Sequence, residues 1–258
     1  MTDNQRLSVA ISVIACTLSQ GTVTIAHLRS GPHERLSARR GPTGLAMTAV
    51  VQQAILEALA RLRQPSEVQL RAPGLLAFPP RSGEHWIHLV PEEPGNLPDL
   101  RPLELAGQLL VEVTPLVNAH GGIDHVWAAA WASSRTWLAF SLAKHTDHGE
   151  IVVGRQSGSA VGLGLLALTR GLAELPDAST PVRLVTDQDE VAQGTANFGV
   201  WQERGWQTSP GRPIAHATYW QQLAEANEKR LVVWDTMLPH HRLRLAEIVG
   251  VSMTLDRP

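Results

Sequence analysis

The alternation of apolar and polar positions divides the chain from residue 123 onward into short strands and helices. Three apolar runs of strand length, separated by turns, come first. A longer segment, 163–175, then repeats leucine at helical spacing and is ended by a proline. The predicted elements of this half are strands 126–133, 137–143, 150–154, 182–185 and 231–235, helix 163–175, two or three short helices before the last strand, and a final helix from about residue 242.

The first half of the chain follows the same order. In both halves, three strand-like runs precede a helix, and a short apolar strand begins about one turn after the helix ends. The predicted elements here are strands 7–16, 22–28, 34–39, 67–71 and 85–90 and helices 46–63 and 103–113. A repeat of this length predicts two domains, 1–121 and 122–258, that meet at the flexible pair Gly121-Gly122. The alternative is that three strands, a helix and a strand is simply a common order.

Composition restricts the function less than the pattern does. A net charge of −2 excludes a generally basic nucleic-acid binder, although it allows a local basic patch. The single cysteine, Cys16, excludes an internal disulfide framework and a zinc site built from several cysteines. No apolar run approaches the length of a membrane span, so we expect a cytoplasmic protein with no membrane partner. The run that ends at Cys16 is interpreted as a first strand rather than a leader peptide, because serines interrupt it.

The richest motif lies between residues 182 and 223. A short apolar strand, 182–185, is followed by a lone carboxylate, Asp187, as in a buried parallel strand that ends at a site. Short helices then carry Gln193-Gly194, Trp201, Gly205-Trp206, Arg212-Pro213 and Trp220. This series resembles type 1 ribonuclease H, from the fourth strand through the fourth helix of its fold, with almost unbroken spacing.

The resemblance implies both a fold and a chemistry. The implied fold is α/β, with tandem ribonuclease H-like domains that are each a mixed five-stranded sheet flanked by helices. The implied chemistry is metal-dependent cleavage of an RNA–DNA hybrid, in which two magnesium ions activate water and stabilise the leaving oxygen. Magnesium requires hard oxygen ligands, so several carboxylates must converge. In the family these come from the first strand, the first helix, the tip of the fourth strand and the last helix.

Only one of these four positions matches an acid in this sequence. By the resemblance, Asp187 is the carboxylate at the tip of the fourth strand. The first-strand position falls at Trp131 or Ala132, the first-helix position at Gly164 and the last-helix position near Leu243. Because a single carboxylate cannot assemble a two-metal site, the sequence predicts a degenerate one. The alternative role for Asp187 is to cap the helix that follows it.

The resemblance also assigns a histidine beside the last helix. His240 matches the mobile histidine of the family, and His241 competes for that role. Asp187 and His240 are therefore the candidate catalytic residues, and Asp187 is the candidate magnesium ligand if the protein is active. We expect no other cofactor.

Five residues of the motif are candidates for binding nucleic acid. Gln193 keeps a substrate contact of the family, and Phe198 replaces a family tryptophan. Phe198 and Trp201 are the aromatic side chains that we expect to be available for stacking on bases. Arg204 and Arg212 supply positive charge, which binds phosphate through the release of counterions.

Three hypotheses follow for the function. The first, which we favour, is a ribonuclease H-like protein that has lost catalytic carboxylates and binds RNA–DNA hybrid or single-stranded nucleic acid. The second is an active magnesium-dependent hybrid endonuclease with relocated carboxylates. Its candidate acids are Asp124, Glu150, Asp187, Asp235 and Glu247. The third is a scaffold that binds a protein partner, because a fold alone does not determine a function.

Overall fold

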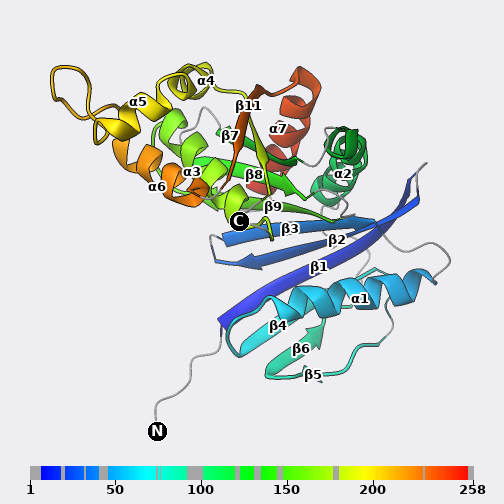
Figure 1. The fold of residues 1–258 in the computed structure, drawn as a ribbon. Helices are drawn as coiled ribbons and strands as arrows, with labels where there is room; N and C mark the ends of the chain where they lie inside the picture. The colour runs from blue at the N-terminus through cyan, green and yellow to red at the C-terminus, as the bar shows by residue number, and fades with distance from the viewer. Residues whose placement is uncertain are drawn as a thin grey trace, which may run out of the picture.

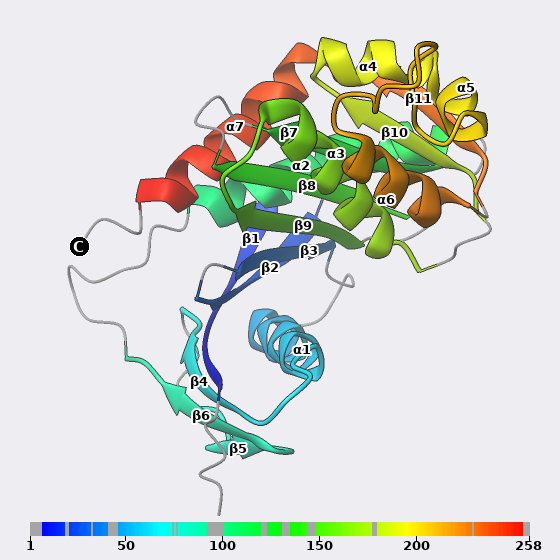
Figure 2. The same cartoon turned by 90° about the vertical axis from the view of Figure 1, so that its left-hand side faces the viewer.

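A computed structural model describes most of the chain. The described residues are 7–18, 21–31, 33–40, 46–73, 75, 77–91, 101–119, 123–130, 135–143, 148–176, 180–228 and 230–254. Their strands form one mixed sheet of 11 strands, and helices cover both of its faces (Figures 1 and 2). The predicted α/β class with a mixed sheet flanked by helices is confirmed.

The elements follow the predicted order closely. The strands are β1 (Leu7–Leu18), β2 (Gly21–Ser30), β3 (His33–Arg40), β4 (Ser66–Arg71), β5 (Arg81–Ser82), β6 (His85–Leu89), β7 (Asp124–Ala130), β8 (Thr136–Leu142), β9 (His148–Arg155), β10 (Val182–Thr186) and β11 (Val232–Thr236). The helices are α1 (Met47–Ala60), α2 (Arg101–Ala119), α3 (Ala160–Ala173), α4 (Asp189–Thr195), α5 (Phe198–Glu203), α6 (Ala217–Asn227) and α7 (Pro239–Thr254).

Local chemistry explains where two of these helices begin. Helix α3 starts three residues earlier than predicted because Ser159 caps it, its hydroxyl accepting the Gly162 N–H at 3.0 Å. Helix α7 starts at Pro239 rather than near residue 242, and proline is favoured in a first turn because its fixed φ suits the helix.

The same five-strand order occurs twice in the sheet. Strands β9-β8-β7-β10-β11 form one series, in which β7 pairs antiparallel with β8 and parallel with β10. Strands β3-β2-β1-β4-β6 form the other, in which β1 pairs antiparallel with β2 and parallel with β4. The two series meet edge to edge where β3 pairs antiparallel with β9. The division into domains at residue 121 falls outside the described residues and stays a prediction.

The buried side chains form three clusters. One lies under α1 in the first half and one under α3 in the second half. The third lies on the opposite face under α2 and α7, and it contains Ile25 and Leu36 of the first half together with Phe140 and Ile151 of the second. The two halves therefore share a core as well as a sheet. No helix within the described ranges has the length and apolar character needed to cross a membrane.

Candidate functional site

Strand β10 ends just before Asp187, where the carboxyl ends of the parallel strands β7, β10 and β11 lie side by side. Val182 and Leu184 face the core under α3, and parallel neighbours β7 and β11 flank the strand on both sides. The chain leaves the strand at Thr186, whose carbonyl accepts the Met237 N–H at 3.0 Å. The Asp187 side chain is only 6% exposed at this point. The sequence thus placed this carboxylate correctly at the end of a buried parallel strand.

The partner of Asp187 is an arginine. Arg242, in the first turns of α7, places its Nε 3.1 Å from Asp187 Oδ2. The other oxygen, Oδ1, is buried and accepts no hydrogen bond from any described residue. Burial raises the pKa of Asp187 above its ordinary value, and the Arg242 guanidinium offsets this effect only in part.

A glutamine covers the helix position where the family has an acid. A Cβ built on Gly164 of α3 would lie 2.6 Å from Gln188 Oε1, so the glutamine side chain lies directly over this glycine. Gln188 Nε2 donates to the Ala160 carbonyl at 3.0 Å and so ties the start of α3 to the tip of β10. Gln188 is also the N-cap residue of α4. The alternative that Asp187 caps this helix is therefore wrong, because the helix begins one residue later than capping by Asp187 requires.

The first-strand position corresponds to alanine. Thr186 of β10 pairs with Ala128 of β7, so the residue beside Asp187 on β7 is near Ala129. Alanine has no atom that can bind a metal, so this position of β7 offers no ligand that Asp187 could share. Trp131 and Ala132, to which the sequence alignment assigned this position, lie outside the described residues.

The last-helix position also requires a correction. Leu243 is 65% exposed and turns away from the site, and Arg242 is the α7 residue that contacts Asp187. The resemblance placed this position near Leu243, and Arg242, one residue earlier, is the residue that lies beside Asp187. The neighbouring Arg244 contacts Glu112 at 3.5 Å and Glu247 at 3.8 Å.

The two histidines of α7 stack on each other. Their ring centroids are 4.0 Å apart, with His240 exposed and His241 buried. Burial, helped by the neighbouring His240, lowers the pKa of His241 to about 4, so its ring is neutral at physiological pH. His240 is thus the solvent-facing member of the pair, and its catalytic role stays a prediction.

The five acids considered for a relocated site do not converge. Asp124 pairs with Val182 at the start of β10, at the end of the strand opposite to Asp187. Each of the other four has an arginine partner of its own. These pairs are Asp187 with Arg242, Glu150 with Arg35 and Arg61, Asp235 with Arg183, and Glu247 with Arg244.

A magnesium ion therefore does not fit the residues present. Among the described residues, no three His, Cys, Asp or Glu side chains are close enough together to hold a metal ion. Magnesium is held through several oxygen ligands, whereas the carboxylate of Asp187 already faces a guanidinium.

The aromatic residues of the motif pack mainly against one another. Phe198 makes edge contacts with Trp206 and Trp220, at centroid distances of 5.6 and 5.9 Å, and Trp201 meets Trp220 at 5.5 Å. The Trp220 ring also explains Gly194, because a Cβ there would collide with it. Phe198 and Trp201 are half-buried, and base stacking by either one stays a prediction.

Arg204 is the C-cap residue of α5 and Arg212 lies in the loop between α5 and α6, which projects from the rest of the molecule (Figure 1). The loop folds back on itself where the Thr208 N–H donates to the Arg212 carbonyl at 2.7 Å, and Gly211 has a positive φ of 77° at the turn. Arg204 and Arg212 are both exposed, and neither forms an ion pair with any residue that the structure describes. Gln193 on α4 is exposed as well, so these three side chains are accessible to a ligand.

Sequence comparison finds relatives that share one name. A Ribonuclease H from Stutzerimonas stutzeri (strain A1501) is 40% identical over 77 residues, which cover 30% of this chain and 50% of the relative. A Ribonuclease H from Pseudomonas paraeruginosa (strain DSM 24068 / PA7) is 32% identical over 105 residues, which cover 40% of this chain and 70% of the relative. The chain thus spans 50% of the first relative and 70% of the second. No family model matches the chain.

Structural comparison gives weaker similarities. A foamy viral protease-reverse transcriptase in complex with RNA/DNA hybrid aligns over 97% of this chain and 39% of its own, with 12% identity and a TM-score of 0.40. The solution structure of a PFV RNase H domain aligns over 52% of this chain and 92% of its own, with 13% identity and a TM-score of 0.37.

Proposed function

The chain belongs to the ribonuclease H family, and we propose that it binds RNA–DNA hybrid or single-stranded nucleic acid without metal-dependent cleavage. The observation that carries this proposal is the ion pair between Asp187 and Arg242. The guanidinium of Arg242 supplies the positive charge that a metal ion would otherwise place beside Asp187. With alanine near the first-strand position and glycine on the helix, neither an attacking water nor a leaving oxygen has a metal to hold it.

The exposed loop between α5 and α6 supports the binding half of the proposal. Arg204 and Arg212 are exposed there, and no described acid neutralises either arginine. Guanidinium groups bind phosphate through paired hydrogen bonds, and their affinity depends on the release of counterions. Two contacts of this kind give weak, salt-sensitive binding, which suits a chain of net charge −2.

The test is binding of a labelled RNA–DNA hybrid, measured by fluorescence anisotropy over a series of salt concentrations. We expect affinity to fall with salt, by about tenfold between roughly 50 and 200 mM for two phosphate contacts, and the double variant Arg204→Glu/Arg212→Glu to abolish binding to hybrid and to single strand. The matched control is Arg63→Glu/Arg81→Glu, which reverses two exposed arginines of the first half and leaves the net charge the same as in the test variant. Equal affinity in the wild type and the Arg204/Arg212 variant would exclude this loop as the binding surface.

A further inference from the structure

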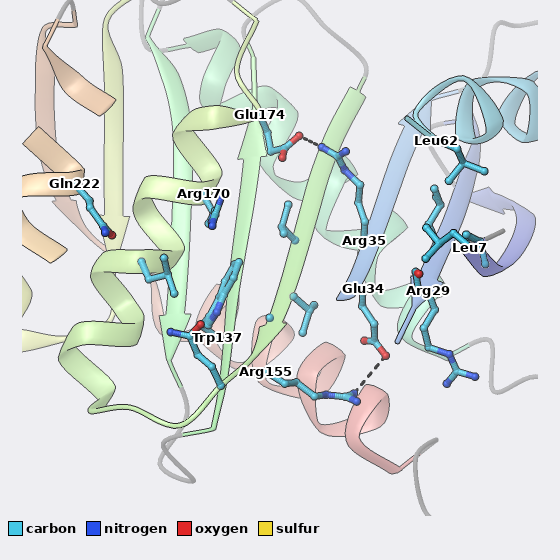
Figure 3. Close-up of a pocket in the computed structure, with 18 of the residues that line it drawn as sticks. Leu7, Arg29, Glu34, Arg35, Leu62, Trp137, Arg155, Arg170, Glu174 and Gln222 are labelled. Atoms are coloured by element: carbon cyan, nitrogen blue, oxygen red, sulfur yellow. Dashed lines mark hydrogen bonds and ion pairs between the residues drawn. The ribbon is translucent and has the colours of Figure 1, made fainter. Parts of the chain in front are cut away.

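A pocket of about 640 Å³ lies at the junction of the two halves, away from Asp187 (Figure 3). Its walls come from β1, β2, β3 and Leu62, just after α1, of the first half and from β8, β9, α3 and α6 of the second. Neither Asp187 nor Arg242 is among the described residues that line it. Pockets of this volume accommodate small organic ligands and cofactors, so the junction can hold more than water.

The charges around the pocket favour an anion. Four arginines and two glutamates line it, which leaves two positive charges in excess. Both glutamates already have partners, because Arg155 lies 3.3 Å from Glu34 and Arg35 contacts Glu174. Glu150 and Arg61, which also belong to this network, contribute one charge of each sign and do not change the balance. An excess of one sign in a recess with apolar walls attracts ligands of the opposite sign.

Arg170 is the lining arginine best placed to meet a ligand. It is exposed on α3, and within the described residues it makes no ion pair or side-chain hydrogen bond. In Figure 3 it lies between Gln222 of α6 and Arg35 of β3. Its guanidinium can therefore bind an anion without first breaking a contact, and its planar fork matches the oxygens of a phosphate.

The rest of the lining suits a flat, partly apolar group. Leu62, Val152 and Leu166 provide aliphatic surface, and Tyr219 provides a ring. Gln222 adds an amide that can both donate and accept hydrogen bonds. The volume exceeds what a phosphate ion needs, so the chemistry indicated is a phosphate attached to a ring system.

We propose that this junction pocket binds a mononucleotide, with its phosphate at Arg170 and its base against the aliphatic wall and Tyr219. The ligand can be a free nucleotide or the terminal nucleotide of a strand, since both present the same chemistry. The site is separate from the α5–α6 loop, so it can be present whether or not that loop binds nucleic acid.

The test is isothermal titration of the full chain with adenosine monophosphate, with adenosine and with inorganic phosphate. We expect adenosine monophosphate to bind more tightly than either fragment. Arg170→Gln, which removes the charge but keeps hydrogen-bond donors, should weaken its binding about tenfold or more, the effect of losing one charge-assisted hydrogen bond. Arg81→Gln is the matched control, an exposed arginine outside both the pocket and the α5–α6 loop, and should leave the affinity unchanged.

Two further measurements decide the source of the ligand and the place of binding. The first measurement is competition with adenosine monophosphate by an oligonucleotide with and without a 5′-phosphate. Competition by the phosphorylated form alone would show that the pocket also binds strand ends. Absence of competition by both forms would restrict the pocket to free nucleotides. Leu166→Trp narrows the pocket from the aliphatic side and should also reduce binding. Absence of adenosine monophosphate binding to the wild type, or equal binding to wild type and Arg170→Gln at unchanged thermal stability, would overturn the proposal.

Discussion

Arg242 Nε lies 3.1 Å from Asp187 Oδ2, and this contact joins the tip of β10 to the first turns of α7. The positive charge beside the buried Asp187 therefore belongs to a side chain of the protein and not to a bound metal ion. An acid in this position has a structural partner, so its presence in the motif does not by itself imply catalysis. The predictions below separate the structural role of this pair from a catalytic one.

Replacement of Asp187 by Asn should have a small effect on stability at neutral pH and a defined dependence on pH. The pKa of Asp187 is raised in the folded state, so ionised Asp187 costs the fold stability and protonation restores it. The wild type should therefore gain stability relative to Asp187→Asn as the pH falls through the raised pKa toward the ordinary aspartate range. Thermal unfolding of both proteins between pH 7 and pH 4 measures this. If Asp187→Asn is less stable than the wild type only at neutral pH, the ion pair with Arg242 stabilises the fold by more than the burial of ionised Asp187 costs.

Restoring carboxylates around Asp187 should create a magnesium site that the wild type lacks. In the double variant Gly164→Glu/Arg242→Asp, two new acids face Asp187, and only the flexible end of Gln188 has to move aside. We expect titration calorimetry to detect magnesium binding in this variant. The matched control, Gly164→Glu/Arg81→Asp, has the same composition of charges, and its second acid is placed on β5, away from Asp187. Equal binding by both variants would contradict the geometry described for α7.

The junction between the halves should contribute strongly to stability. Glu150 of β9 is buried and accepts hydrogen bonds from Arg35 at 3.0 Å and Ser37 at 2.9 Å, both on β3, and it also pairs with Arg61. Glu150→Gln should lower the free energy of unfolding by about 3 kcal/mol, because it leaves two arginines facing a neutral amide. Glu247→Gln, in an exposed pair, should change it by less than about 1 kcal/mol.

Denaturant unfolding followed by circular dichroism measures both variants. Because the halves share a core, we also expect a single transition for the wild type. Two separate transitions, or similar losses in Glu150→Gln and Glu247→Gln, would show that the halves are held together by something other than this network.

Acid should destabilise the first half through His27. This buried β2 side chain has its pKa lowered to about 4, first by burial and then by Arg29 and Arg155. Because the folded pKa lies below the unfolded one, stability is complete above about pH 6.5 and is lost as the pH falls toward 4. The loss attributable to His27 is up to about 3 kcal/mol at pH 4. His27→Leu should remove this part of the acid sensitivity in denaturant titrations, and an unchanged pH dependence would contradict the assignment.

Much of the fold was predictable because it is encoded locally. Leucines at helical spacing identified α3, and the apolar run 182–185 identified β10 with the acid at its tip. The pairing of β3 with β9 was not predictable, since it joins residues more than 100 positions apart and leaves no periodic signal in either strand.

The missing acids of the site could be predicted from the sequence, but the side-chain contacts around Asp187 could not. Gly164 and the absence of an acid at the first-strand position could be read directly from the alignment with the family. Arg242 was missed as the partner of Asp187 because this contact joins the tip of β10 to α7, two segments distant in the sequence, and leaves no local signal in either one.

The most direct test of the central claim is cleavage of an RNA–DNA hybrid by the purified protein with magnesium or manganese, comparing wild type and Asp187→Asn at concentrations that saturate binding. The ion pair of Asp187 with Arg242 and the missing neighbouring acids predict the same background level of product for both proteins. Robust cleavage by the wild type that disappears in Asp187→Asn would contradict the account and show that Asp187 takes part in catalysis.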